Sequence, residues 1–305
     1  MDARHLPVLL RESVEWLGAG RGGLFVDATL GLGGHAEAIL EASPAARVLG
    51  LDRDPDARAL AAARLSRFGD RVEIRAGNFR ELERLAGDRA PFQGVLADLG
   101  VSSLQLDRAE RGFSFRGDGP LDMRMGPEGP TARDLVNEAT EGELETILRE
   151  YGEEPEARRV ARAIVGARRA APIDTTRQLA EVVRGAKRPV HGEERIDPAT
   201  RTFQALRIAV NEELDAVGEL LEQAMRLLDT GGRLVVISYH SLEDRIVKNR
   251  FRDAARGEVD PITGRTLVET RILEVLTRKP LRPTEAEVGA NPRARSARLR
   301  AARRL

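Results

Sequence analysis

The sequence predicts an α/β fold, with a doubly wound, mostly parallel sheet that is interrupted by a small all-helical insertion. Four short apolar runs recur about every 22 to 25 residues, and stretches rich in Ala, Glu and Arg lie between them. The next convincing apolar run follows only after roughly a hundred residues more. Strands and helices that alternate at this spacing are typical of a parallel sheet, because each parallel connection needs a crossover.

The first four strands follow from the apolar runs. A helix is expected before them at Val8 to Leu17, and the helix between the second and third runs begins with Pro55, which suits a first-turn position. The expected strands are Leu24 to Val26, Val48 to Leu51, Val72 to Ile74 and Val95 to Leu96, and the expected helices are Ala36 to Glu41, Pro55 to Phe68 and Phe79 to Leu85.

The insertion combines a loop with capped helices. A Gly-, Arg- and Phe-rich loop covers Arg111 to Pro130. Side chains that cap helix N-termini follow it at Thr131 with Asp134, Thr140 with Glu143, and Asp174 before Gln178 to Val183. We therefore predict one domain from residues 1–105 and 198–305, and an inserted loop plus helical domain from residues 106–197.

The sheet is expected to resume after one long helix. Asp197 as N-cap and Pro198 open this helix, an apolar stripe packs it on the sheet, and Gly231 and Gly232 stop it. The remaining elements are expected as a strand at Arg233 to Ser238, a helix at Ser241 to Ala255, and strands at Arg271 to Thr277 and Ala297 to Leu299.

Composition excludes several classes of protein. Cysteine is absent from the 305 residues, which excludes disulfides, thiolate zinc sites, iron–sulfur clusters and cysteine nucleophiles. The 49 basic and 49 acidic residues cancel, so any nucleic-acid patch must be local. Residues 278–305 carry nine basic and two acidic residues, a tail that either contacts phosphate or is merely solvated. With no targeting segment and no membrane-length apolar run, we expect a cytoplasmic protein without a membrane partner.

A glycine-rich turn follows the first strand. Asp27-Ala-Thr-Leu-Gly31-Leu-Gly33-Gly34-His35-Ala36 joins a strand to a helix, where backbone N–H groups can receive carboxylate or phosphate. Gly31, Gly33 and Ala36 also satisfy the dinucleotide pattern, and Asp52 lies about 20 residues later, as a ribose-binding acid does. These features favour an adenosine cofactor, either a nicotinamide dinucleotide or S-adenosylmethionine.

Two acids favour S-adenosylmethionine. Asp27 precedes the glycines, as acids usually do in methyltransferases of that type. Asp98-Leu-Gly-Val-Ser-Ser103 follows the fourth strand, where amino-methyltransferases place an Asp or Asn before a tight turn. Hydride transfer has no evident use for this second acid.

Taken together, the motifs resemble one family nearly from end to end, the RsmH (MraW) 16S rRNA (cytosine-N4)-methyltransferases. The motifs that carry the resemblance are His5-x-Pro-Val-Leu-Leu, Asp27-x-Thr-x-Gly-x-Gly-Gly-His35, Asp52-Arg-Asp54, Asp98-Leu-Gly-Val-Ser-Ser103-x-Gln105, Arg111-Gly-Phe-Ser-Phe115, Gly119-Pro-Leu-Asp-Met-Arg-Met125, Ala199-Thr-Arg-Thr-Phe-Gln204, Ser238-x-His-Ser-Leu-Glu-Asp-Arg245 and Asn291-Pro-Arg-Ala-Arg-Ser296.

The resemblance implies a Rossmann-like methyltransferase domain, a helical substrate-recognition insertion, and S-adenosylmethionine as cofactor. The implied substrate is the exocyclic N4 of a cytidine at position 1402 of 16S rRNA, in the decoding centre of the small (30S) ribosomal subunit. The implied donor site consists of Gly33, Gly34, His35, Asp52, Phe79, Asp98 and Gln105. In it the glycines admit the methionine carboxylate, Asp52 takes the ribose diol, and Phe79 covers adenine. For His35 a hydrogen bond to the loop is an equal alternative.

The chemistry of the residues agrees with an amine acceptor. Methylation at C5 of a pyrimidine needs a cysteine that adds to C6, and this chain has none. An exocyclic amine needs only alignment with the methyl group and an acceptor for its N–H. We assign Asp98 as that acceptor, with a carbonyl of Leu99 or Gly100 as helper, and His240 as a second catalytic residue that steers the base.

Other positions keep two interpretations. Leu99-Gly-Val departs from the Pro-Pro-aromatic sequence usual after this acid, so the aromatic residue that stacks on the base must come from elsewhere. Phe113, Phe115 and Tyr239 are the candidates, with core packing as the alternative for each. Ser241 with Asp244 is expected to form a capping box. His191 lies in a polar loop without metal-ligand spacing, and no metal is predicted.

Three functions stay open at this point. The first is the RNA methyltransferase, whose insertion grips phosphate through arginines while the base turns outward. The second is an NAD(P)-dependent dehydrogenase, and the third is a non-catalytic ribosome assembly factor. A homodimer is compatible with the sequence. The gripping arginines would be Arg158, Arg159, Arg162, Arg168 and Arg169.

Overall fold

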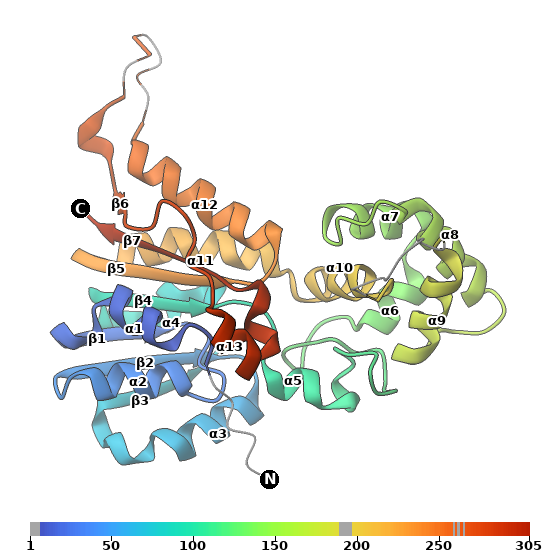
Figure 1. Ribbon diagram of the computed structural model, residues 1–305, viewed down its shortest axis with the longest axis horizontal. Coiled ribbons are helices and arrows are strands. Elements are labelled where there is room, and N and C mark those ends of the chain that lie inside the picture. The colour runs from blue at the N-terminus through green and yellow to red at the C-terminus, as the bar shows by residue number, and fades with distance from the viewer. Residues whose placement is uncertain (1–6, 189–196, 259, 261–262, 265) are drawn as a thin grey trace. The chain divides into compact units, whose positions relative to one another are not determined.

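The chain divides into two compact units. The computed structural model describes residues 7–188, 197–258, 260, 263–264 and 266–305. The first unit comprises Met1–Gly100 and Leu214–Leu305, and the second comprises Val101–Glu213 (Figure 1).

A seven-stranded sheet organises the first unit, in the order β3-β2-β1-β4-β5-β7-β6. Strands β1 to β5 pair in parallel, whereas β7 is antiparallel to both β5 and β6. This arrangement confirms the predicted doubly wound, mostly parallel α/β fold. The strands are β1 (Gly23–Asp27), β2 (Ala46–Asp52), β3 (Val72–Ala76), β4 (Phe92–Asp98), β5 (Leu228–Ser238), β6 (Leu273–Val275) and β7 (Arg298–Arg304).

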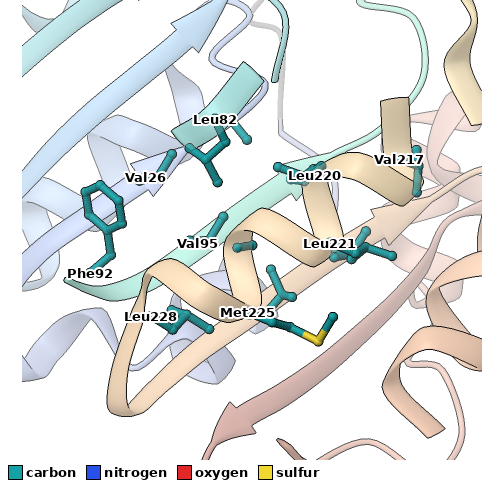
Figure 2. Close-up of a cluster of buried hydrophobic side chains, with 14 of the residues drawn as sticks. Val26, Leu82, Phe92, Val95, Val217, Leu220, Leu221, Met225 and Leu228 are labelled. Carbon is teal, nitrogen blue, oxygen red and sulfur yellow. The ribbon is translucent and has the colours of Figure 1, made fainter. Parts of the chain in front are cut away.

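Helices cover both faces of this sheet, because successive side chains of a strand point to opposite faces. Phe25 belongs to the apolar cluster under α1 (Leu10–Leu17), α2 (Gly34–Ala42) and α3 (Pro55–Leu65). Its neighbour Val26 belongs to the other cluster, under α4 (Leu82–Ala86), α11 (Glu213–Leu227) and α12 (Ser241–Arg256). Figure 2 shows the side chains of α11, among them Leu220 and Leu221, packed over β4 and the neighbouring β5.

Short elements complete the first unit. They are the 3-10 turns η1 (Ala19–Arg21), η2 (Ser66–Arg71), η3 (Phe79–Glu81), η4 (Gly87–Arg89), η6 (Val268–Thr270) and η7 (Pro292–Ser296), and the helix α13 (Glu285–Ala290).

The second unit is helical and has an apolar core of its own. Two of its capping boxes are the predicted ones, at Thr131 and Thr140. The third lies one residue later than predicted, because Thr175 is the N-cap and Asp174 pairs with an arginine instead. The elements are α5 (Ser103–Asp107), η5 (Ala109–Arg111), α6 (Ala132–Glu138), α7 (Glu141–Glu150), α8 (Ala157–Arg168), α9 (Thr176–Ala186) and α10 (Thr200–Asn211).

The prediction of one long helix after Asp197 was wrong. Glu212 adopts a left-handed conformation (φ 50°, ψ 40°) that ends α10 and separates it from α11. Residues of α10 such as Phe203 pack in the core of the second unit, whereas those of α11 pack on the sheet. The apolar stripe runs on through both helices, so the pattern conceals the break. The boundaries of the units accordingly lie at 100/101 and 213/214 rather than at 105/106 and 197/198.

The ends of these elements also differ from the prediction. Helix α10 begins at Thr200, and the Asp197 carboxylate accepts the N–H of Ala199 (2.9 Å) ahead of it. Helix α11 ends at Leu227, so Gly231 and Gly232 lie within β5 rather than at the helix end. Within the described part of the chain, no helix has both the length and the apolar character that crossing a bilayer requires.

Candidate active site

Three neighbouring strands each have an aspartate as their last residue. Asp27 is the last residue of β1, Asp52 of β2 and Asp98 of β4. Because these strands are adjacent and parallel, their last residues lie along one edge of the sheet. Tyr239 follows the neighbouring β5 at the same edge. The structure thus brings acids from separate parts of the chain together.

The glycine-rich turn connects this edge to α2. Gly31 (φ +51°) and Gly33 (φ +77°) adopt left-handed conformations that favour glycine. The N–H of Gly31 donates to Asp52 Oδ2 (2.8 Å). Gly33 is the N-cap of α2 and, as a glycine, has no side chain with which to cap it, so the first turn presents backbone N–H groups at the glycine turn. Gly34 begins α2 against Pro7, whose Cγ would lie 2.3 Å from an added Cβ.

Asp27 is a buried acid with an unsatisfied oxygen. Its side chain is fully buried, Oδ1 accepts the N–H of Thr29 (3.3 Å), and Oδ2 has no hydrogen-bond partner among the described residues. Burial raises the pKa of this carboxyl to about 7, and repulsion from Asp52 adds to the effect while backbone N–H groups oppose it. Asp27 therefore gains or loses its proton near neutral pH.

We expect Asp27→Asn to stabilise the protein increasingly as the pH rises from about 4 to about 7. The raised pKa means that native Asp27 keeps a proton which the unfolded chain has lost, so its contribution to stability is full below about pH 4 and is lost through pH 7. The asparagine variant avoids this loss and should be more stable by about 1–3 kcal/mol at pH 8. Urea unfolding at several pH values measures the difference, with the exposed Asp70→Asn as control. Parallel stability curves would contradict the expectation.

Asp52 is the last residue of β2. Its Oδ1 accepts the N–H of Asp54 (2.8 Å), and burial raises its pKa. Its carbonyl accepts the N–H of Gly77 (3.1 Å), which leads from β3 into η3, where Phe79 is the first residue. Phe79 is partly buried and packs against the apolar cluster that includes α4. Asp52 and Phe79, two predicted cofactor residues, thus lie at adjacent strand ends.

Asp98 has the most elaborate surroundings of the three acids. Its Oδ1 accepts the hydroxyl of Tyr239 (2.8 Å), its Oδ2 lies 3.8 Å from His35 Nδ1, and its side chain is 20% exposed. Burial raises the pKa of Asp98 to about 7, the charges of Asp27 and Glu243 raise it further, and the Tyr239 hydrogen bond lowers it. A partly accessible carboxyl with this pKa can accept a proton at neutral pH.

His35 lies at the start of α2, and its ring is buried. Nε2 donates to the carbonyl of Val8 (3.1 Å), because a carbonyl can only accept. This contact joins the start of α2 to the segment before α1 and not to the glycine turn, and the predicted contact of His35 with the donor stays a prediction. The other nitrogen of His35 faces Asp98.

His240 caps α12, which corrects the capping prediction. Its Nδ1 accepts the N–H of Glu243 (3.4 Å), and the pair forms the capping box that was expected one residue later at Ser241 and Asp244. Asp244 instead accepts two hydrogen bonds from Arg300, the shorter at 2.6 Å. Its pairing with a buried arginine of β7 removes it from the cap. The predicted contact of His240 with a base stays a prediction.

The remaining predicted residues belong to the second unit. Gln105 is buried and forms a capping box with Ser102 at the start of α5. Phe113 packs in the core of that unit, and Phe115 contacts Phe203 edge-on with ring centroids 4.8 Å apart. Packing therefore accounts for both phenylalanines. His5 and His191, which the sequence motifs singled out, lie outside the described residues.

Tyr239 has a contact that the sequence did not predict. It was considered as an aromatic for base stacking, whereas its hydroxyl binds Asp98 and its N–H donates to the buried Glu243 (2.9 Å). Gly100 (φ +97°) lets the ring approach the turn, since an added Cβ would lie 3.3 Å from it. The sequence feature that could have indicated this contact is the position of Tyr239 directly after an apolar strand. The neighbour relation of β4 and β5 was hidden by the insertion between them.

Comparison with known proteins identifies the family of this chain. The model of the MraW methylase family matches residues 2–305. Proteins named Ribosomal RNA small subunit methyltransferase H are 51% identical, in Methylorubrum extorquens (99% of this chain and 87% of that protein) and in Geobacter sulfurreducens (100% of both). An rRNA methylase structure from Streptococcus thermophilus covers 96% of this chain and 95% of that one, with 12% identity and a TM-score of 0.44. The family match over residues 2–305 and the two relatives at 51% identity show that the chain belongs to the MraW methylase family.

Proposed function

We propose that this protein transfers a methyl group from S-adenosylmethionine to the exocyclic N4 of a cytidine in 16S rRNA, the cytidine at position 1402 by resemblance. The names of its relatives specify methylation of small-subunit ribosomal RNA, which supports the substrate class. The proposed reaction takes place in the cytoplasm, on RNA of the 30S subunit. The single observation that carries the proposal is the position of Asp98, a partly accessible carboxyl at the tip of β4 that accepts the Tyr239 hydroxyl and whose N–H donates to Thr29 of the glycine-rich turn.

The strand edge suits a cationic adenosine ligand. Asp27, Asp52 and Asp98 gather there, and Asp27 Oδ2 is buried without a hydrogen-bond partner among the described residues. A ligand with a sulfonium and an ammonium group would compensate these acids. Gly33 and Gly34 would admit its carboxylate at the start of α2, and Asp52 and Phe79 would take ribose and adenine. When bound, S-adenosylmethionine supplies the electrophilic methyl group.

Asp98 is the residue to which we assign the role of proton acceptor for the cytosine N4. Asp98 would act at the cytosine N4 as this nitrogen takes the methyl group that bound S-adenosylmethionine would supply. The nitrogen then carries an excess proton, which the Asp98 carboxylate can take because its pKa lies near 7. Transfer to C5 is disfavoured, since the chain has no cysteine to add to C6. Two further residues are proposed by resemblance or position. His240 would steer the base, and Gln105 would bind the donor.

The arginines of α8 are proposed to hold RNA phosphates. Arg162 and Arg159 are about half exposed or more, and their acidic neighbours lie at the long ion-pair distances of 3.5 and 3.8 Å. Arg158 is also exposed. Arg168 is less available, because its Nη1 donates to the Val136 carbonyl (2.7 Å). Weak surface pairs of this kind exchange readily for phosphate.

Nucleoside mass spectrometry tests the proposed function. Purified protein is incubated with methyl-labelled S-adenosylmethionine and small ribosomal subunits that lack the modification, and the rRNA is digested to nucleosides. We expect the label in N4-methylcytidine. Label on a pyrimidine carbon or on ribose would overturn the assignment, and quenching of a reduced nicotinamide without any methyl transfer would favour the dehydrogenase alternative.

We expect Tyr239→Phe to lower methyl transfer at pH 7 by roughly tenfold, with recovery at pH 9. The Tyr239 hydroxyl stabilises the Asp98 carboxylate, so its removal raises the pKa of Asp98 and leaves less carboxylate at neutral pH. The pH dependence of single-turnover rates measures the shift. Tyr151→Phe, the other tyrosine, is the control. An unchanged pH profile would show that Tyr239 does not tune Asp98.

A further inference from the structure

Five exposed cationic side chains occupy one stretch near the C-terminus. Between β6 and β7 the stretch contains two acids, Glu285 and Glu287, and Glu287 accepts the N–H of Leu9 (2.7 Å). The overall charge of the chain is zero, so this excess is local. The five residues, which we call the basic rim, are Arg278, Lys279, Arg282, Arg293 and Arg295.

The sheet fixes where this stretch lies. Arg298 at the start of the antiparallel β7 pairs with Ser238, the last residue of β5. Leu281 and Leu299 exchange both backbone hydrogen bonds (2.9 Å each), which holds the first half of the stretch beside β7. The stretch therefore lies at the end of the sheet where β5 ends, the edge that carries Asp98. Figure 1 shows α13 near the end of the sheet at which β7 begins.

The turn η7 is built to present its arginines. Ala294 and Ala297 are buried (0% and 1% exposed) in the cluster under α1 and α2, whereas Arg293 and Arg295 are exposed. The Asn291 side chain accepts the N–H of Arg293 (3.2 Å) and caps the turn. Buried alanines thus anchor a short rigid turn while the intervening side chains face solvent.

The arginines of this C-terminal region have separate tasks. Arg300 and Arg298 pair with Asp244, which fixes β7 against α12. Arg295 and Arg282, by contrast, have no ion-pair partner among the residues described. Cations that are anchored by their backbone and leave their charge in solvent are suited to bind an anion from outside.

We propose that the basic rim binds phosphodiester groups of the rRNA strand next to the nucleotide that is methylated. The inference rests on the proposed function, because it places the substrate at the edge with Asp98. That edge is acidic and by itself repels a polyanion. Cations at its border offset this repulsion and hold the flanking backbone, a contact that supplies affinity and position without reading sequence.

The double variant Arg282→Gln/Arg295→Gln tests the rim. Fluorescence anisotropy measures binding of the full-length protein to an rRNA fragment with the target cytidine over a series of salt concentrations. We expect affinity at low salt to fall about tenfold and the slope of log K against log salt to decrease by about 1–2. Affinity for S-adenosylmethionine should not change, and KM for the RNA should rise while kcat is kept.

A matched variant controls for net charge. Arg21→Gln/Arg47→Gln removes the same charge from the opposite end of the sheet, where β1 and β2 begin. We expect its salt slope to equal that of the unchanged protein. If the two double variants lose the same affinity, or if the rim variant keeps its slope while it methylates N4 normally, the rim is not a phosphate site. Absence of N4-methylcytidine from the unchanged protein instead refutes the proposed function.

Discussion

Replacing Asp98 by alanine is expected to reduce the rate of methyl transfer by a factor of about 10²–10⁴. The variant loses the carboxyl that would accept the N4 proton, and no other acid of the strand edge shares its contact with Tyr239. Single-turnover rates with saturating donor and small subunits measure the effect. Asp98→Asn keeps the shape of the side chain but cannot take a proton, so it should be almost equally impaired.

Suitable controls separate this effect from a loss of folding. Asp70→Ala removes an exposed acid (side chain 86% exposed) and should keep the full rate. Thermal melting of Asp98→Ala should remain cooperative. A variant that methylates at the normal rate would remove Asp98 from the reaction. A variant that lacks methylation yet supports normal ribosome assembly in cells would favour the assembly-factor alternative.

We expect Asp52→Ala to weaken binding of S-adenosylmethionine by a factor of about 10–100. Hydrogen bonds to a charged group are worth about 1.5–3 kcal/mol when they replace contacts with water, and the proposed role gives Asp52 two ribose hydroxyls. Isothermal titration calorimetry measures the affinity. The Gly31 N–H that donates to Asp52 also loses its acceptor, so the measured loss includes a contribution from the turn itself.

A ligand without the ribose hydroxyls resolves these two causes. A 2′,3′-dideoxy analogue should bind the unchanged protein weakly, because it lacks the groups that Asp52 would accept. For Asp52→Ala the analogue and S-adenosylmethionine should bind with similar affinity. If the variant discriminates between the two ligands as strongly as the unchanged protein, Asp52 does not bind the ribose.

Sequence patterns predicted the parallel half of the fold well, because each crossover places one apolar run after one helical stretch. They failed where one continuous apolar stripe contributes side chains to two separate hydrophobic cores. The apolar stripe from Phe203 to Leu228 reads as a single helix, whereas the left-handed Glu212 divides it between the two units. The last strand was also underestimated. Alternating arginines and alanines in β7 do not resemble a buried strand until Arg300 is seen to pair with Asp244.

The site was predictable to the extent that it depends on strand ends. Acids that directly follow apolar runs were expected to converge, and Asp27, Asp52 and Asp98 lie at adjacent strand tips. Contacts between distant segments were not predictable. The hydroxyl of Tyr239 reaches Asp98 across 141 positions of sequence, and a helical insertion separates their strands. The sequence also does not reveal whether His240 or Ser241 caps α12, because both are followed three residues later by an acid, Glu243 or Asp244.

The most direct test of the central claim is calorimetric titration of S-adenosylmethionine and S-adenosylhomocysteine at pH 6 and pH 8. The claim is that the acids at the strand tips compensate the positive sulfonium. Asp27 and Asp98 have pKa values of about 7 without ligand, so a cation should displace their protons. We predict proton release on binding and roughly tenfold tighter binding at pH 8 for the sulfonium ligand, with a much smaller effect for the neutral thioether. Equal pH dependence for both ligands would contradict the account.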